Sequence, residues 1–92
     1  MENAMNGILY KVVTPYDVTK EVLKAFRDSQ DLTQQQLASL IGYRTPAGIC
    51  QMETGVRAVT RNTRQAIFKL IQEYLTMLDA KKEQLETMAL AA

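Results

Sequence analysis

Residues 32–55 read LTQQQLASLIGYRTPAGICQMETG, and this stretch decides which fold the chain adopts. Thr33, followed three residues later by Gln36, is the pattern of a capping box, in which each side chain bonds the backbone N–H of the other residue at a helix start. Apolar residues then recur at helical spacing until Gly42, a residue type that commonly ends helices. The sequence therefore predicts a short helix here, with a buried stripe of Leu37, Leu40 and Ile41.

A second short helix is predicted directly after that glycine. Thr45 is suited to cap a helix and Pro46 to occupy its first position, because proline gives up no intrahelical bond there. Gly55 marks the end, which gives a helix over residues 45–54. Ala38 in the earlier helix is small enough to let the two helices cross closely. Two short helices in this order predict a helix-turn-helix unit, whose second helix fits the major groove of DNA.

Further helices are predicted on both sides of this unit. A threonine followed by proline and an acidic residue predicts a first helix from about residue 15 to 30. Residues 1–13 contain a β-prone run and are open to three interpretations: an edge strand, an arm or a disordered start. Thr60 is expected to cap the last helix, which is long because residues 61–92 contain neither glycine nor proline.

The last helix carries apolar residues that alternate four and three positions apart, as in a heptad seam. Additional apolar residues widen this face in its first half only, so we expect the first half to pack on the domain. The second half has a narrow stripe and needs a partner. The residues expected at a dimer contact are Tyr74, Leu78, Leu85 and Met88.

Residue composition argues against catalysis and against metal binding. The 92 residues include no histidine and a single cysteine, so the commonest general base is absent and no zinc site can be assembled. We expect no enzymatic activity, no metal and no cofactor. The lone Cys50 is typical of a reducing compartment. No apolar run reaches the length of a membrane span and no basic-then-apolar leader is present, so a cytoplasmic protein is expected.

Positive charge is concentrated in the middle of the chain. The formal net charge is only +1, yet residues 33–72 carry four arginines and one lysine against Glu53 alone. The planar guanidinium of arginine donates two parallel hydrogen bonds to a phosphate. This distribution favours a nucleic-acid partner, although a solvated charged face would give the same pattern.

Three segments resemble the Cro/lambda-repressor-like helix-turn-helix family: LTQQQLA at 32–38, LIG at 40–42 and ICQMETG at 49–55. The resemblance covers residues 18–72 and implies an all-α, four- to five-helix lambda-repressor-like DNA-binding domain, here with a long C-terminal helix. It also implies an ion pair between Arg27, near the end of the first helix, and Glu53. The chain departs from the family between Gly42 and Glu53, where it is one residue longer.

Candidate DNA contacts lie in the two short helices and just after them. Gln34 begins the earlier helix, where the family often places a glutamine on phosphate. Arg44 suits a base or a phosphate, and Gln51 can pair with adenine through two hydrogen bonds. Phosphate contacts are expected of the arginines that follow: Arg57, Arg61 and Arg64. The residues that we expect to contact DNA are Gln34, Arg44, Thr45, Ala47, Gly48, Gln51, Arg57 and Arg61.

We therefore divide the chain into an N-terminal arm or short strand (1–14), a helix-turn-helix DNA-binding domain (15–75) and a C-terminal helical extension for dimerisation (76–92). The leading hypothesis is a transcriptional regulator, a repressor of phage or bacterial type, that binds a double-stranded operator as a homodimer. One alternative is an antitoxin of the same fold, which would also grip a toxin through the long C-terminal helix or the N-terminal arm. Another is an interaction adaptor of this fold that does not bind DNA, which the near-neutral net charge favours.

Overall fold

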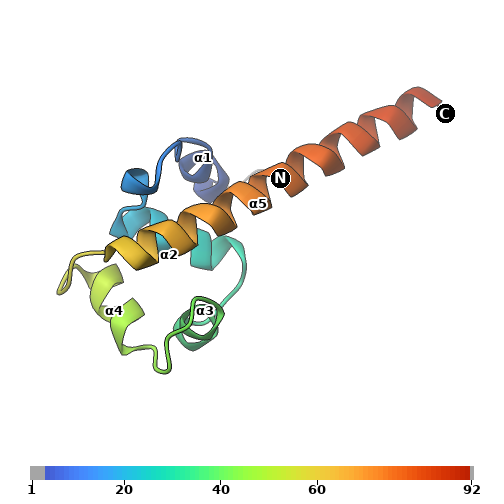
Figure 1. The fold of residues 1–92 in the computed structure, drawn as a ribbon. Helices are drawn as coiled ribbons and strands as arrows, with labels where there is room; N and C mark the ends of the chain where they lie inside the picture. Colours follow the sequence, from blue (N-terminus) through green and yellow to red (C-terminus); the bar gives the residue numbers. More distant parts are fainter. Residues whose placement is uncertain (1–3, 92) are drawn as a thin grey trace.

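The computed structural model describes the backbone of residues 4–91 and the side chains of residues 7–87. Every regular element in this range is helical, so the predicted all-α fold class with a long C-terminal helix is confirmed. The domain measures 52 × 22 × 20 Å, and its long axis follows the last helix, which projects past the others (Figure 1). The elements are α1 (Ala4–Tyr10), the 3₁₀ turn η1 (Pro15–Asp17), α2 (Lys20–Ser29), α3 (Gln34–Leu40), α4 (Ala47–Thr54) and α5 (Arg61–Ala91).

The core lies where α1, α2 and α4 meet the first half of α5. Leu23 of α2 and Ile49 of α4 are fully buried, as are Ile67 and Ile71 one turn apart on α5. α1 packs against α2 and α5, whereas α4 packs against α2 and α3. α1 and the α3–α4 pair therefore lie on different sides of α2 (Figure 1). The expectation that the first half of the last helix packs on the domain is confirmed.

The N-terminal segment is a packed helix, which corrects the expectation of an arm or a short strand over residues 1–14. Leu9 and Val12 are buried, and the Gln72 side-chain amide donates a hydrogen bond of 3.2 Å to the Val12 carbonyl. Strand propensity depends strongly on neighbouring packing, and burial against α2 and α5 outweighs it here. The part of that expectation that concerns residues 1–3 lies outside the described residues.

The helix predicted over residues 15–30 is divided in two. Between η1 and α2, Val18 is fully buried and has a ψ of 88°, which is outside the helical region. Thr19 then starts α2 as its N-cap, with its Oγ1 accepting a hydrogen bond of 3.3 Å from the Val22 N–H. The sequence therefore contains two helix starts in succession, at Thr14 and Thr19, and the break between them lets Val18 turn into the core.

The start of α3 follows the prediction closely. The Gln36 N–H donates to Thr33 Oγ1 at 3.0 Å, and the Thr33 N–H donates to Gln36 Oε1 at 2.8 Å, so the capping box is confirmed. α3 ends two residues before Gly42, which adopts a left-handed φ of +93° in the turn that follows. Glycine takes this conformation without the strain that a Cβ would bring.

The start of α4 differs from the prediction, because Thr45 does not cap it. Pro46 is the N-cap residue, and its carbonyl accepts the first intrahelical bond, 2.9 Å from the Cys50 N–H. Proline has no side-chain acceptor, so α4 has no side-chain cap. At the other end Gly55 stops α4 with a φ of +83°, as predicted.

Candidate nucleic-acid interface

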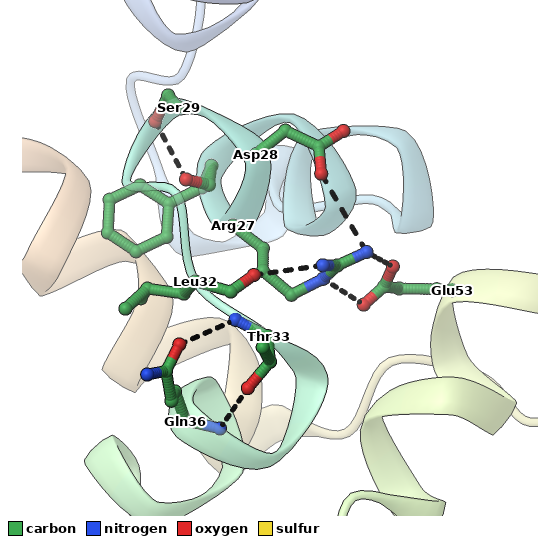
Figure 2. A network of polar contacts seen from close by, with 8 residues as sticks. Arg27, Asp28, Ser29, Leu32, Thr33, Gln36 and Glu53 are labelled. Carbon is green, nitrogen blue, oxygen red and sulfur yellow. Dashed lines mark hydrogen bonds and ion pairs between the residues drawn. The ribbon is translucent and has the colours of Figure 1, made fainter.

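A buried ion pair holds the C-terminal end of α4 in place. Arg27 Nε and Nη2 donate hydrogen bonds to Glu53 Oε2 and Oε1, each 2.9 Å long (Figure 2). The third guanidinium nitrogen, Nη1, donates to the Leu32 carbonyl at 2.9 Å. One side chain of α2 thus ties α4 to the loop before α3, and the ion pair that the family resemblance implied is present.

Both members of this ion pair are largely shielded from solvent. The Glu53 side chain is 4% exposed and the Arg27 side chain 16% exposed. The hydrogen bonds that Arg27 donates to Glu53 raise the pKa of Arg27 above its ordinary value. A buried charge without its partner is strongly unfavourable, so rotation of α4 away from α2 is opposed by the loss of both bonds.

A second contact fixes the turn between α3 and α4. The Tyr43 hydroxyl lies 2.7 Å from Thr63 Oγ1 and 3.4 Å from Thr60 Oγ1, both near the start of α5. The Tyr43 N–H also donates to the Ala38 carbonyl at 2.7 Å. Hydrogen bonds from the two threonines lower the pKa of Tyr43 below its ordinary value. α4 is therefore restrained at both ends: Glu53 holds its C-terminal turn, and Tyr43 holds the turn that precedes it.

The outer side of α4 borders a hollow of about 320 Å³, here called the α4 hollow. Its lining contains two guanidinium groups and one side-chain amide but no carboxylate. Six of the eight expected DNA contacts meet there. The lining residues are Tyr43, Arg44, Thr45, Ala47, Gly48, Gln51, Met52 and Arg57.

Small residues keep the first turn of α4 open. A Cβ added to Gly48 would meet no atom within 4 Å, so this part of the helix faces free space. Ala47 beside it is exposed. Ile49 and Met52 of the same helix are buried in the core, with Met52 at the base of the α4 hollow. The helix therefore packs part of its surface against the protein and exposes Ala47, Cys50 and Gln51.

Two expected contacts lie outside the α4 hollow. Gln34 is the first residue of α3 and is half-buried. Arg61 borders a different hollow, next to Tyr16 of η1. The sequence did not single out Tyr43 or Lys20 as site residues. Tyr43 lines the α4 hollow, and Lys20 lines a neighbouring hollow that shares Arg57 with it. Their positions depend on contacts between residues far apart in the chain, for which no local pattern exists.

The expected dimer residues divide into two groups. Tyr74 and Leu78 are partly buried against the core, whereas Leu85, on the projecting part of α5, is 66% exposed. The side chain of Met88 lies outside the described residues. Beside Tyr74 the surface has an apolar hollow of about 350 Å³, whose apolar lining is Phe26, Leu32, Leu40, Leu70, Tyr74 and Met77.

Comparison with known proteins returned no match: no family model fits the chain, and no curated protein or solved structure is significantly similar to it. None of the described helices is both long and apolar enough to cross a membrane. Within residues that the structure describes, no three His, Cys, Asp or Glu side chains come together as a metal site.

Proposed function

We propose that the protein is a sequence-specific DNA-binding regulator, a repressor, that places α4 in the major groove of an operator. The observation that carries this proposal is the α4 hollow. Arg44 and Arg57 supply positive charge to it, Gln51 supplies an amide, and no carboxylate opposes an anionic ligand. A helix held at both ends presents these groups in one fixed arrangement, which recognition of a specific DNA sequence requires.

The dimensions of α4 suit this role. An α-helix with its side chains is about 10–12 Å across. The major groove of B-DNA is about 12 Å wide and admits an α-helix. In that position Gln51 would form a bidentate pair with adenine, and Arg44 would contact guanine or a phosphate. Arg57 follows α4 in the turn, where a phosphate contact would set the position of the helix.

Binding as a homodimer is part of the proposal. The projecting half of α5 exposes Leu85, and the apolar hollow beside Tyr74 is lined partly by the same helix and partly by α2 and α3. A two-fold contact between two copies of α5 would cover these side chains. The operator would then contain two inverted half-sites with centres about 34–36 Å apart.

Selection of bound duplexes from a random pool, followed by footprinting, tests the function. We expect enrichment of an inverted repeat whose halves are one helical turn apart. A single half-site would contradict the dimer, and failure to enrich any sequence would contradict sequence-specific binding. The Gln51→Ala variant is the matched control, since it should alter the enriched sequence while keeping the fold.

An antitoxin role is the second candidate, and the projecting part of α5 is the observation that favours it. A toxin could cover Leu85 in place of a second copy, while α4 still bound DNA.

An adaptor that does not bind DNA is separable from both by a salt titration with generic duplex, because phosphate binding weakens steeply as salt rises. In either DNA-binding case we place the protein in the cytoplasm, where its operator would be.

A further inference from the structure

Two more hollows continue from the α4 hollow across the surface. The second, of about 330 Å³, lies between the start of α2 and the turn from α4 to α5, and its lining includes Lys20, Arg57 and Arg64. The third, of about 170 Å³, lies between η1 and α5 and includes Arg61 and Arg64. Arg57 lines both the first and the second hollow, and Arg64 lines both the second and the third. Each hollow therefore adjoins the next through a shared arginine.

Cationic side chains line the three hollows in turn, and we call them the basic track: Arg44, Arg57, Lys20, Arg64 and Arg61. The described lining of the three hollows includes one carboxylate, that of Glu21. Both ion pairs found among the described side chains involve Arg27, so no member of the track is neutralised by one. The track thus keeps its positive charge available to a ligand.

Lys20 reaches the track because of the conformation at Gly55. The position that a Cβ would take at Gly55 lies 3.1 Å from Lys20 Nζ, so the ammonium group sits directly over the turn that ends α4. Gly55 has a left-handed φ of +83°, and its lack of a side chain leaves room for that approach. The fold thereby brings a lysine of α2 beside Arg57.

Arg64 connects the second and third hollows and is only partly solvated. Arg64 is half-buried, and its Nε atom is buried without a hydrogen-bond acceptor among the described residues. An unsatisfied guanidinium donor is unfavourable. An oxyanion that draws this group outward would remove that cost, and a side chain already restricted by packing loses less freedom on binding.

We infer that the basic track binds the sugar-phosphate backbone of one DNA strand, beyond the bases that α4 reads. The inference rests on the proposed function and adds its backbone contacts. A line of five cations over three hollows fits an extended polyanion, because a small anion needs donors that converge on one point. Tyr16 is 81% exposed beside Arg61 and Arg64, where its hydroxyl can donate to a phosphate oxygen.

Salt-dependent binding of charge-matched variants tests this inference. Lys20→Gln removes one positive charge from the track, and Lys24→Gln removes one from an exposed site one turn along α2 that lines none of the three hollows. Fluorescence anisotropy would measure the Kd of each protein for the selected duplex and for an unrelated duplex across a salt series. Melting followed by circular dichroism checks that both variants fold.

We expect Lys20→Gln to weaken binding to both duplexes roughly three- to tenfold and to reduce the slope of log Kd against log salt by about 0.9, the value for one phosphate. Arg61→Gln, at the far end of the track, should do the same, and Lys24→Gln should change Kd less than about twofold. Phosphate ethylation should interfere with wild-type binding outside the bases read by α4, and Lys20→Gln should abolish that interference at one position.

Two outcomes overturn the inference in distinguishable ways. If wild type binds the selected duplex but Lys20→Gln and Arg61→Gln behave as Lys24→Gln does, the track does not contact DNA and the proposed function stands. If wild type binds neither duplex with salt-dependent affinity, both the track and the proposed function fail.

Discussion

Arg27 and Glu53 stand 26 residues apart in the chain and are joined by two hydrogen bonds of 2.9 Å each. Glu53→Gln keeps the shape of the side chain but removes the charge, which leaves the Arg27 guanidinium poorly compensated. We expect the free energy of unfolding to fall by about 3 kcal/mol, near the lower end for a broken buried pair because Arg27 is partly exposed. Urea denaturation measures this change.

Combining that substitution with Arg27→Met shows whether the pair acts as a unit. The double variant should be less destabilised than the two single changes added together. Once the first substitution has broken the ion pair, the second leaves no buried charge without its partner. Additive losses of stability would mean that the two residues contribute independently.

Tyr43→Phe should lower the free energy of unfolding by about 1 kcal/mol, the typical net contribution of one hydrogen bond. The substitution removes the 2.7 Å contact with buried Thr63 and leaves the ring in place. Tyr16→Phe is the matched control, since Tyr16 is exposed and should be nearly neutral in stability. Equal effects of the two changes in thermal melting would show that Tyr43 does not anchor the turn.

Gln51→Ala should relax sequence preference at one base pair of each half-site. A bidentate contact between a side chain and a base contributes about 1–3 kcal/mol of discrimination. Affinities for duplexes substituted one base pair at a time would locate the effect. Arg57→Ala should instead weaken binding to every duplex alike, so a uniform loss in Gln51→Ala would assign that residue to the backbone.

Acid should remove the stabilisation that Asp17 provides. The N–H groups of Val13 and Thr14 each donate to Asp17 Oδ2 at 2.9 Å, which lowers its pKa below the ordinary value of 3.8. Because the folded pKa is the lower one, the contribution is complete above 3.8 and disappears as pH falls through the folded pKa. The difference in Tm between wild type and Asp17→Asn should therefore shrink in acid, and a constant difference would contradict this.

Leu85→Lys should shift the protein toward the monomer. Leu85 is 66% exposed on the projecting part of α5, and a charge there opposes burial against a second copy. Thr87→Lys adds the same charge on an exposed position outside the heptad seam and should leave assembly unchanged. Sedimentation equilibrium measures both, and identical masses for the two variants would place the dimer contact elsewhere.

Local signals made much of the fold predictable from sequence. The capping box of Thr33 and Gln36 and the stops at Gly42 and Gly55 act within a few residues, so each can be recognised without knowledge of the fold. The Arg27–Glu53 pair was expected because a family resemblance carried it, not because any spacing required it.

Other features depend on packing that a sequence pattern does not contain. The N-terminal segment is helical because Leu9 and Val12 find a place in the core, which its β-prone composition did not indicate. The candidate site predicted from the sequence lacked two residues for the same reason. Lys20 meets Gly55, and Tyr43 meets Thr63, only after α2, α4 and α5 have packed together.

Cys50 offers a way to locate α4 on DNA, since it is the one cysteine of the chain and is exposed on that helix. An iron chelate attached to its thiol would cleave nearby strands of the selected duplex. We predict cleavage inside each half-site, on both strands facing one major groove. A chelate on Thr87→Cys in a Cys50→Ser background should cleave elsewhere or not at all. Absence of cleavage from Cys50, in a complex that remains bound, would show that α4 does not lie in the groove.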